Sequence, residues 1–179
     1  MSDGDWSEGA LRAILRAGIR LLAHVPDAGL APLLTRCGRD PSIRIVGLAD
    51  EREGGPALLA GAWLGGLRGV LACQSSGIGN LVNMLGVSAV GRFPLAMLVT
   101  MRGEWGEENP WEVPMGQAVP AVLGAMGVRL FSLERAQDAE AVLDGALGLA
   151  FGSEQMVAVL IRQRLVGAKR FVPAGATAS

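Results

Sequence analysis

The stretch Gly69-Val-Leu-Ala-Cys-Gln-Ser-Ser-Gly-Ile-Gly-Asn80 decides the fold class, because an apolar run passes directly into a polar, glycine-containing segment. We expect residues 69–73 to form a buried strand and residues 81–90 to form a helix. Gly77 and Gly79 permit a tight turn in the loop 74–80 between them. A strand that leads through a short loop into a helix is half of a βαβ unit, the building block of parallel sheets.

The same pattern recurs along the whole chain. Further apolar runs, each expected to be a strand, cover residues 19–25, 43–48, 94–100, 128–131 and 156–161. Segments with helical periodicity lie between them, including residues 116–126 and 136–151. This alternation favours an α/β fold, a three-layer doubly wound domain with a six-stranded parallel sheet and helices on both faces. We expect a single domain over residues 1–165 and a solvated C-terminal tail over residues 166–179.

Composition excludes several classes of protein. The chain has 179 residues, of which 50% are hydrophobic and 18% charged, so it has ample apolar surface for a folded core. A net charge of −1 gives no compositional case for binding nucleic acid or an anionic membrane. The longest apolar stretch, residues 54–73, is interrupted by Pro56, Arg68 and several glycines, so we expect no membrane-spanning helix.

Reactive side chains are scarce. There is one histidine, His24, and there are two cysteines, Cys37 and Cys73, but no tyrosine. These three residues lie far apart in the sequence, so we expect no metal site in this chain. Two distant cysteines without a signal peptide indicate reduced thiols in a cytoplasmic protein. If the protein is an enzyme, a cofactor should supply most of the chemistry.

In a doubly wound sheet, ligands bind beyond the carboxyl ends of the strands. The loops expected there cover residues 26–29, 49–55, 74–80 and 101–115. In the second of these loops, Asp50, Glu51 and Glu53 precede a helix rich in alanine and glycine. They either cap that helix, as its dipole favours, or include a carboxylate that faces a cofactor.

The fourth loop and the lone histidine also allow two interpretations each. The loop 101–115 is longer than ordinary strand-to-helix connections and is rich in acidic residues, tryptophan and proline. It is either an oligomer contact or surface flap, or a lid that places Arg102 where an anionic substrate can pair with it. His24, at the end of the first strand, has either a structural role or a role in the site.

Four segments, taken in order, carry a family resemblance. They are Val25-Pro-Asp27; Glu53-Gly-Gly-Pro-Ala-Leu-Leu-Ala-Gly-Ala-Trp-Leu64; Gln74-Ser-Ser-Gly-Ile-Gly-Asn80 followed by Val82-Asn83; and Arg102-Gly-Glu104 followed by Pro114-Met-Gly-Gln117. Over residues 10–165 the chain resembles the pyrimidine-binding domain of thiamine-diphosphate-dependent 2-oxoacid decarboxylases, and it is similar to the sulfopyruvate and phosphonopyruvate branch. It departs from the family at Ser75, where asparagine is usual, and in the glycine-rich segment after Glu53.

The resemblance implies roles for particular residues. Glu53 matches the family's glutamate, which hydrogen-bonds N1′ of the cofactor pyrimidine and thereby promotes loss of the thiazolium proton. Glu51 is the competing assignment, and we prefer Glu53 for its distance to Ala62-Trp63. The implied cofactor-binding residues are Asp27, Glu53, Gln74, Ser76, Gly77 and Asn80. The implied substrate residues are Arg102, Gln117 and His24.

The family also uses a second domain, which holds the diphosphate through Mg²⁺ and carries a Gly-Asp-Gly motif followed by an asparagine pair. This sequence has no Gly-Asp-Gly, and its asparagines stand only at positions 80, 83 and 109. The resemblance therefore implies a pyrimidine-binding subunit whose diphosphate-binding beta subunit brings the magnesium, in a heterotetramer or larger assembly. The implied reaction is decarboxylation of a 2-oxoacid such as 3-sulfopyruvate or phosphonopyruvate.

Two other interpretations remain open. The chain could be a non-catalytic partner or regulatory subunit that keeps the pyrimidine-domain fold. It could also be an unrelated small-molecule-binding α/β protein.

Overall fold

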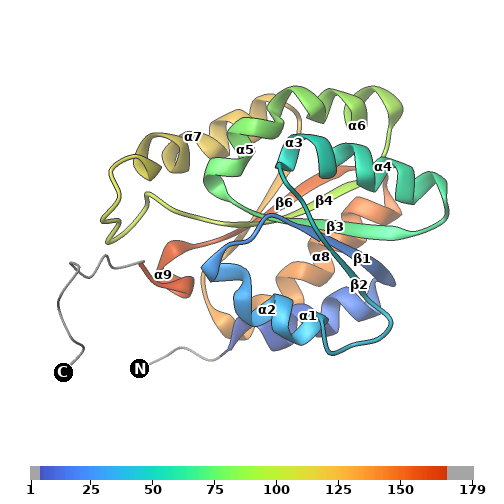
Figure 1. The fold of residues 1–179 in the computed structure, drawn as a ribbon, viewed down its shortest axis with the longest axis horizontal. Helices are drawn as coiled ribbons and strands as arrows, with labels where there is room; N and C mark the ends of the chain where they lie inside the picture. The colour runs from blue at the N-terminus through green and yellow to red at the C-terminus, as the bar shows by residue number, and fades with distance from the viewer. Residues whose placement is uncertain (1–4, 169–179) are drawn as a thin grey trace.

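The computed structural model describes residues 5–168, except for the side chains at positions 53 and 54. It contains a six-stranded sheet in which every pair of neighbouring strands is parallel, in the order β2-β1-β3-β4-β6-β5 (Figure 1). The strands are β1 (Ile19–His24), β2 (Arg44–Gly47), β3 (Arg68–Gln74), β4 (Leu95–Thr100), β5 (Arg129–Leu133) and β6 (Met156–Ile161). The predicted fold class and parallel sheet are confirmed.

Helices cover both faces of the sheet, giving three layers (Figure 1). One face carries α1 (Trp6–Arg16), α2 (Ala31–Cys37) and α8 (Ala139–Gly152). The other face carries α3 (Glu51–Gly54), α4 (Pro56–Leu64), α5 (Ser75–Leu81), α6 (Leu85–Gly91) and α7 (Glu112–Ala125). A short helix, α9 (Gln163–Val166), follows the last strand. Within residues 5–168, no helix is long and apolar enough to cross a membrane.

The central strands β3 and β4 are apolar between their end residues because both of their faces are covered. In β4 all six residues are buried. Successive side chains alternate between the two cores, with Ala96 and Leu98 packed on the α1/α2/α8 side and Met97 and Val99 on the α4–α7 side. The edge strands β2 and β5 are partly exposed. Cys37 and Cys73 are free and buried, as expected for small apolar core residues.

The predicted glycine turn at 74–80 is wrong, because α5 begins at Ser75, directly after β3. Gly77 and Gly79 are helical residues whose missing side chains leave room for neighbours. A Cβ at position 77 would overlap the carboxylate of Glu51, and one at position 79 would lie 3.3 Å from the sulfur of Met115. Gly77 is therefore required by close packing rather than by backbone conformation, and Gly79 allows a close approach of Met115.

Helix α7 also differs from the prediction, since it begins at Glu112 rather than at residue 116. Pro114 lies in its first turn, where a backbone N–H has no helical partner and its loss costs nothing. Gly116 then lets α7 approach the loop after β4, because a Cβ at this position would overlap the carbonyl oxygen of Arg102.

This contact gives a test with a control inside the same helix. Replacing Gly116 with alanine should lower the free energy of unfolding by about 3 kcal/mol, because a tightly packed contact has to open. Replacing Gly124 with alanine should raise it by about 0.5–1 kcal/mol, since a Cβ there meets no atom within 4 Å and alanine favours the helix. Chemical denaturation of the two variants measures both changes. Equal effects would contradict the close approach of α7 to Arg102.

Candidate functional site

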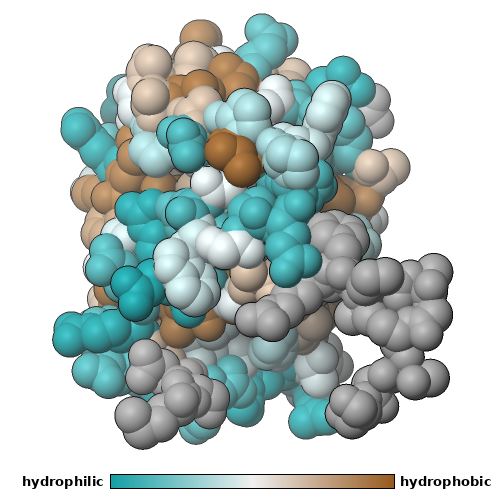
Figure 2. Space-filling model, turned by 90° about the vertical axis from the view of Figure 1, so that its left-hand side faces the viewer, coloured by the Kyte–Doolittle hydropathy of each residue, from teal (hydrophilic) through white to brown (hydrophobic). Residues whose placement is uncertain are grey.

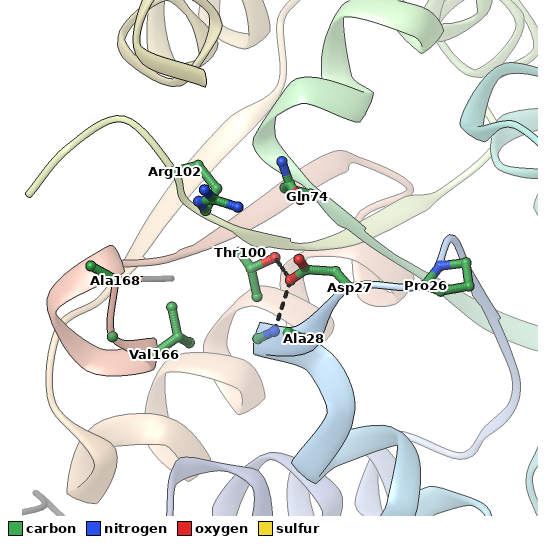
Figure 3. A pocket seen from close by; sticks show the side chains of 10 residues that line it. Pro26, Asp27, Ala28, Gln74, Thr100, Arg102, Val166 and Ala168 are labelled. Atoms are coloured by element: carbon green, nitrogen blue, oxygen red, sulfur yellow. Dashed lines mark hydrogen bonds between the residues drawn. The ribbon is translucent and has the colours of Figure 1, made fainter. Parts of the chain in front are cut away.

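A cavity of about 380 Å³ opens at the carboxyl edge of the sheet (Figure 3). It is lined by Pro26, Asp27, Ala28, Gly29, Gln74, Thr100, Arg102, Val166, Gly167 and Ala168. The polar lining residues come from the ends of β1, β3 and β4. The strand order reverses between β1 and β3, so the cavity lies where ligands of doubly wound proteins bind. Val166, Gly167 and Ala168 belong to the predicted tail, and its remainder, residues 169–179, lies outside the described residues.

Asp27 is fixed at the floor of this cavity. The hydroxyl of Thr100 donates to Asp27 Oδ2 at 2.7 Å, and the backbone N–H of Gly29 donates to the same oxygen at 3.0 Å (Figure 3). Gly29 has no side chain, and a Cβ there would lie 3.0 Å from Asp27 Oδ2 and 3.1 Å from Thr100 Cγ2. The three residues therefore hold one carboxylate in a single orientation, with a distant strand supplying one of the two donors.

Arg102 lines the cavity, and Glu107 of the same loop binds it in a two-pronged ion pair. Arg102 Nε donates to Glu107 Oε2 at 2.6 Å, and Arg102 Nη2 donates to Oε1 at 2.5 Å. Only 11% of the Arg102 side chain and 3% of the Glu107 side chain are exposed. The backbone N–H groups of Gly103 and Asn109 donate to the same carboxylate. The Arg102 contact, helped by these donors, lowers the pKa of Glu107 to about 2.

Gln163, which is fully buried, ties this loop to α9. Its side-chain oxygen accepts from the backbone N–H groups of Glu104 and Trp105 at 2.9 and 3.0 Å, and its Nε2 donates to Glu107 at 2.9 Å. The carboxylate of Glu104 accepts in turn from the Gln163 backbone and from Arg162. The first half of the loop is thus held against α9, the helix that leads to the far wall of the cavity.

A second buried carboxylate, that of Glu51, lies between α3 and α5. Its side chain packs where Gly77 leaves space, and its Oε2 accepts from Asn80 Nδ2 at 3.1 Å. Only 5% of Glu51 is exposed. Asp50 caps α3 by accepting from the backbone of Arg52 at 2.7 Å, so the capping role belongs to Asp50 and leaves Glu51 for another role.

The other predicted site residues differ in whether they line the cavity. Gln74 lines it and donates to Ser76 Oγ at 2.9 Å. His24 ends β1 and does not line it, and its Nδ1 is buried with no hydrogen-bond partner among the described residues. Gln117 is exposed on α7 and does not line the cavity. The side chain of Glu53, the predicted catalytic residue, lies outside the described part of the structure.

Three residues that the structure places in or behind the site were not predicted. Thr100 had a signal, since it is the one hydroxyl residue in the apolar run 94–100 at the expected strand end. Glu107 had none, because it is one of several carboxylates in an acidic loop. Gln163 also had none, because nothing in the sequence distinguishes it from a solvated glutamine.

Across the described residues, no three His, Cys, Asp or Glu side chains are grouped closely enough to hold a metal ion. At one edge of the sheet the structure offers a fixed arginine, Arg102, which is paired with Glu107, and two further fixed carboxylates, those of Asp27 and Glu51. It can orient and hydrogen-bond an anionic ligand.

Comparisons with known proteins point to a single group. No protein-family model matches the chain. The chain is 31% identical over 156 residues to the sulfopyruvate decarboxylase subunit alpha of Methanococcus maripaludis, covering 87% of this chain and 93% of that protein. It is 39% identical over 93 residues to the phosphonopyruvate decarboxylase of Streptomyces viridochromogenes, covering 51% of this chain and 23% of that one.

A solved structure shares the fold. It is the 2-oxoglutarate:ferredoxin oxidoreductase from Magnetococcus marinus, with a TM-score of 0.74 and 17% identity. The match covers 91% of this chain and 29% of that chain. At this identity the likeness shows the fold alone.

The lowered pKa of Glu107 gives a stability test. A carboxylate whose pKa is lowered by folding stabilises the protein above its unfolded pKa, here 4.5, and loses that effect as the pH falls toward its folded pKa of about 2. At pH 7, replacing Glu107 with glutamine should lower the free energy of unfolding by about 3 kcal/mol. This difference from the wild type should shrink between pH 4.5 and 2.5, as measured by chemical denaturation. The exposed control Glu134→Gln should show a small difference at every pH, and a constant deficit for Glu107→Gln would contradict the ion pair.

Proposed function

Because the chain belongs to the family of sulfopyruvate decarboxylase alpha subunits, we propose that it is the pyrimidine-binding subunit of a two-component, thiamine-diphosphate-dependent decarboxylase. The substrate is a 2-oxoacid with a second anionic group, such as 3-sulfopyruvate or phosphonopyruvate. The observation that carries this proposal is a cavity that joins a fixed arginine and a fixed aspartate at the switch point of the sheet. Helix α5 starts at this cavity and reaches the buried carboxylate of Glu51 at Gly77.

The residues present fit one half of a thiamine diphosphate site. When bound, this cofactor supplies the electron sink for loss of carbon dioxide. We assign the carboxylate that hydrogen-bonds the pyrimidine to α3, with Glu53 as the first candidate from its spacing to Ala62-Trp63 and Glu51 as the second. Glu51 remains a candidate because it is buried and accepts a hydrogen bond from Asn80, as expected for a carboxylate that faces the cofactor ring away from water. The proposed cofactor contacts beyond α3 are Asp27, Gln74, Ser76, Gly77 and Asn80.

Arg102 is the proposed receptor for the sulfonate or phosphonate group, because it is the arginine that lines the cavity. His24 remains a candidate for substrate contact, since its buried Nδ1 has no partner among the described residues. We propose no contact for Gln117 inside this cavity, because it is exposed on α7.

The diphosphate and its Mg²⁺ fall to a second subunit in this proposal, as the relatives' name "subunit alpha" suggests. A surface for that subunit is available on α4 and α6. Helix α4, with the sequence Pro-Ala-Leu-Leu-Ala-Gly-Ala-Trp-Leu, has no charged side chain on any face, as is typical of a helix covered on all sides. Yet Leu64 is 75% exposed, and Val90 on α6 is 88% exposed.

Helix α4 also borders a hollow that it forms with strands β1 and β2. The hollow has a volume of about 550 Å³ and is lined by Arg20, Leu21, Arg44, Val46, Ala57, Leu58, Gly61, Ala62 and Leu67. Figure 2 faces the opposite end of the molecule, where the area around the sheet edge is mostly hydrophilic. We propose that the beta subunit covers the α4/α6 surface and places acidic groups opposite Arg20 and Arg44.

The test of the proposed activity uses the complex. The chain is co-expressed with the product of the neighbouring reading frame, supplied with thiamine diphosphate and Mg²⁺, and assayed for carbon dioxide release from 2-oxoacids. Glu53→Gln should lower kcat at least a hundredfold with folding and assembly intact, because an amide cannot share a proton with the pyrimidine N1′ as a carboxyl group would. Glu51→Gln, made in parallel, should keep a kcat higher than that of Glu53→Gln.

The opposite ranking of the two variants would transfer the role to Glu51. Full activity of both variants would contradict the proposed role of a carboxylate on α3. A stable complex that releases no carbon dioxide from any 2-oxoacid would instead indicate a regulatory subunit.

The subunit surface has a separate test. Leu64→Asp and Val90→Asp should each weaken binding of the beta subunit at least tenfold, because each puts a charge into an apolar contact. Ala141→Asp adds the same charge at an exposed position of α8, on the opposite layer, and should leave binding unchanged. Binding is measured by calorimetric titration, with circular dichroism as a check of folding. Unchanged affinity in both α4/α6 variants would exclude this surface.

A further inference from the structure

Glu107 is the most strongly hydrogen-bonded carboxylate near the cavity, yet it does not line the cavity. Its two oxygens accept from Arg102 Nε and Nη2, from the backbone of Gly103 and Asn109, and from Gln163 Nε2. Both oxygens of a carboxylate together have about four lone-pair sites, so this one is fully engaged by the protein. It therefore has no capacity left for a ligand and no freedom to move with one.

The fork from Glu107 determines which part of Arg102 remains available. A guanidinium has five N–H donors in one rigid plane. Glu107 occupies the edge formed by Nε and Nη2. Among the described residues this leaves Nη1 as the guanidinium nitrogen without a hydrogen-bond partner, on a side chain that lines the cavity (Figure 3). The direction of the remaining donors is thus set before any ligand binds.

The charges around Arg102 do not by themselves attract an anion. An anion that approaches Arg102 meets a guanidinium already neutralised by Glu107, and Asp27 lines the same cavity. The net attraction for an anion is therefore small, and recognition has to come from directed hydrogen bonds. A donor held in one direction favours a ligand whose anionic group reaches that position over a ligand that has no such group there.

We propose that Glu107 is a positioning residue that holds Arg102 with one edge toward the cavity and thereby makes the cavity selective for substrates with a terminal sulfonate or phosphonate group. This inference rests on the proposed function, since it concerns how the same site chooses its substrate. Glu107 acts through Arg102 and touches no reacting atom. Gln163 supports it from behind by joining the carboxylate to α9.

The direct test measures binding without catalysis. The full chain is titrated calorimetrically with ethanesulfonate, a compound that carries the sulfonate but not the reacting group. Glu107→Gln and Glu107→Asp should each raise the dissociation constant about tenfold. Glutamine removes the charge, whereas aspartate keeps the charge but is one methylene too short to make the fork. The control Glu108→Gln, an exposed carboxylate in the same loop, should leave the dissociation constant within twofold.

The two variants separate positioning from neutralisation. If Glu107 only cancels the charge of Arg102, glutamine should tighten ethanesulfonate binding and aspartate should leave it unchanged. Either result would overturn the inference, and so would a wild-type chain that does not bind ethanesulfonate. Because aspartate retains the negative charge beside Arg102, it keeps the test valid if the glutamine variant does not fold.

Kinetics of the complex provide a second readout that a purely structural role would not change. For Glu107→Asp, kcat/KM for 3-sulfopyruvate should fall about tenfold, mainly through KM, whereas kcat/KM for pyruvate, which has no terminal anion, should stay within threefold. An equal fall for both substrates would overturn the inference while leaving the decarboxylase function in place. A wild-type complex without activity would overturn the proposed function, and the ethanesulfonate titration would still decide the role of Glu107.

Discussion

Strand β4 lies in the middle of the sheet, and its burial on both faces determines where polar side chains can meet a ligand. Its residues must be apolar until the chain leaves the sheet at Thr100, and β3 follows the same rule up to Gln74. Because all the strands are parallel, these exits open on one edge of the sheet. The polar side chains that line the cavity are therefore confined to the last residue of a strand and the first three residues after it.

At that edge, two carboxylates are fixed by residues from distant parts of the chain. Thr100 holds Asp27 across 73 positions of sequence, and Asn80 holds Glu51 across 29. Each contact joins two loops or helices that would otherwise be positioned only by their own strands. The edge is thus preorganised, and binding need not pay for ordering it.

The sequence predicts the layered fold and the edge, because both depend on local periodicity and on the general geometry of parallel sheets. It also places Asp27, Gln74 and Arg102 together, since each follows a predicted strand. It cannot predict that Gly77 is a helical contact, because its reason is the side chain of Glu51, 26 positions earlier. Nor can it predict which carboxylate of an acidic loop binds Arg102, because that choice depends on how the loop folds back. The rank of Glu53 against Glu51 is of the same kind, since spacing favours one and burial supports the other.

The hydrogen bonds by which Gln163 joins the Arg102 loop to α9 have a consequence for how such a protein can change over evolutionary time. Gln163 contributes nothing to the lining of the cavity, yet it connects the loop that carries Arg102 with the segment that forms the opposite wall. Because Gln163 holds the two walls together from outside the cavity, the lining residues can be replaced one at a time while the cavity keeps its shape. New substrate ranges can then arise by substitution at Gln74, Thr100 or residues 166–168, provided that the buried amide behind them is retained.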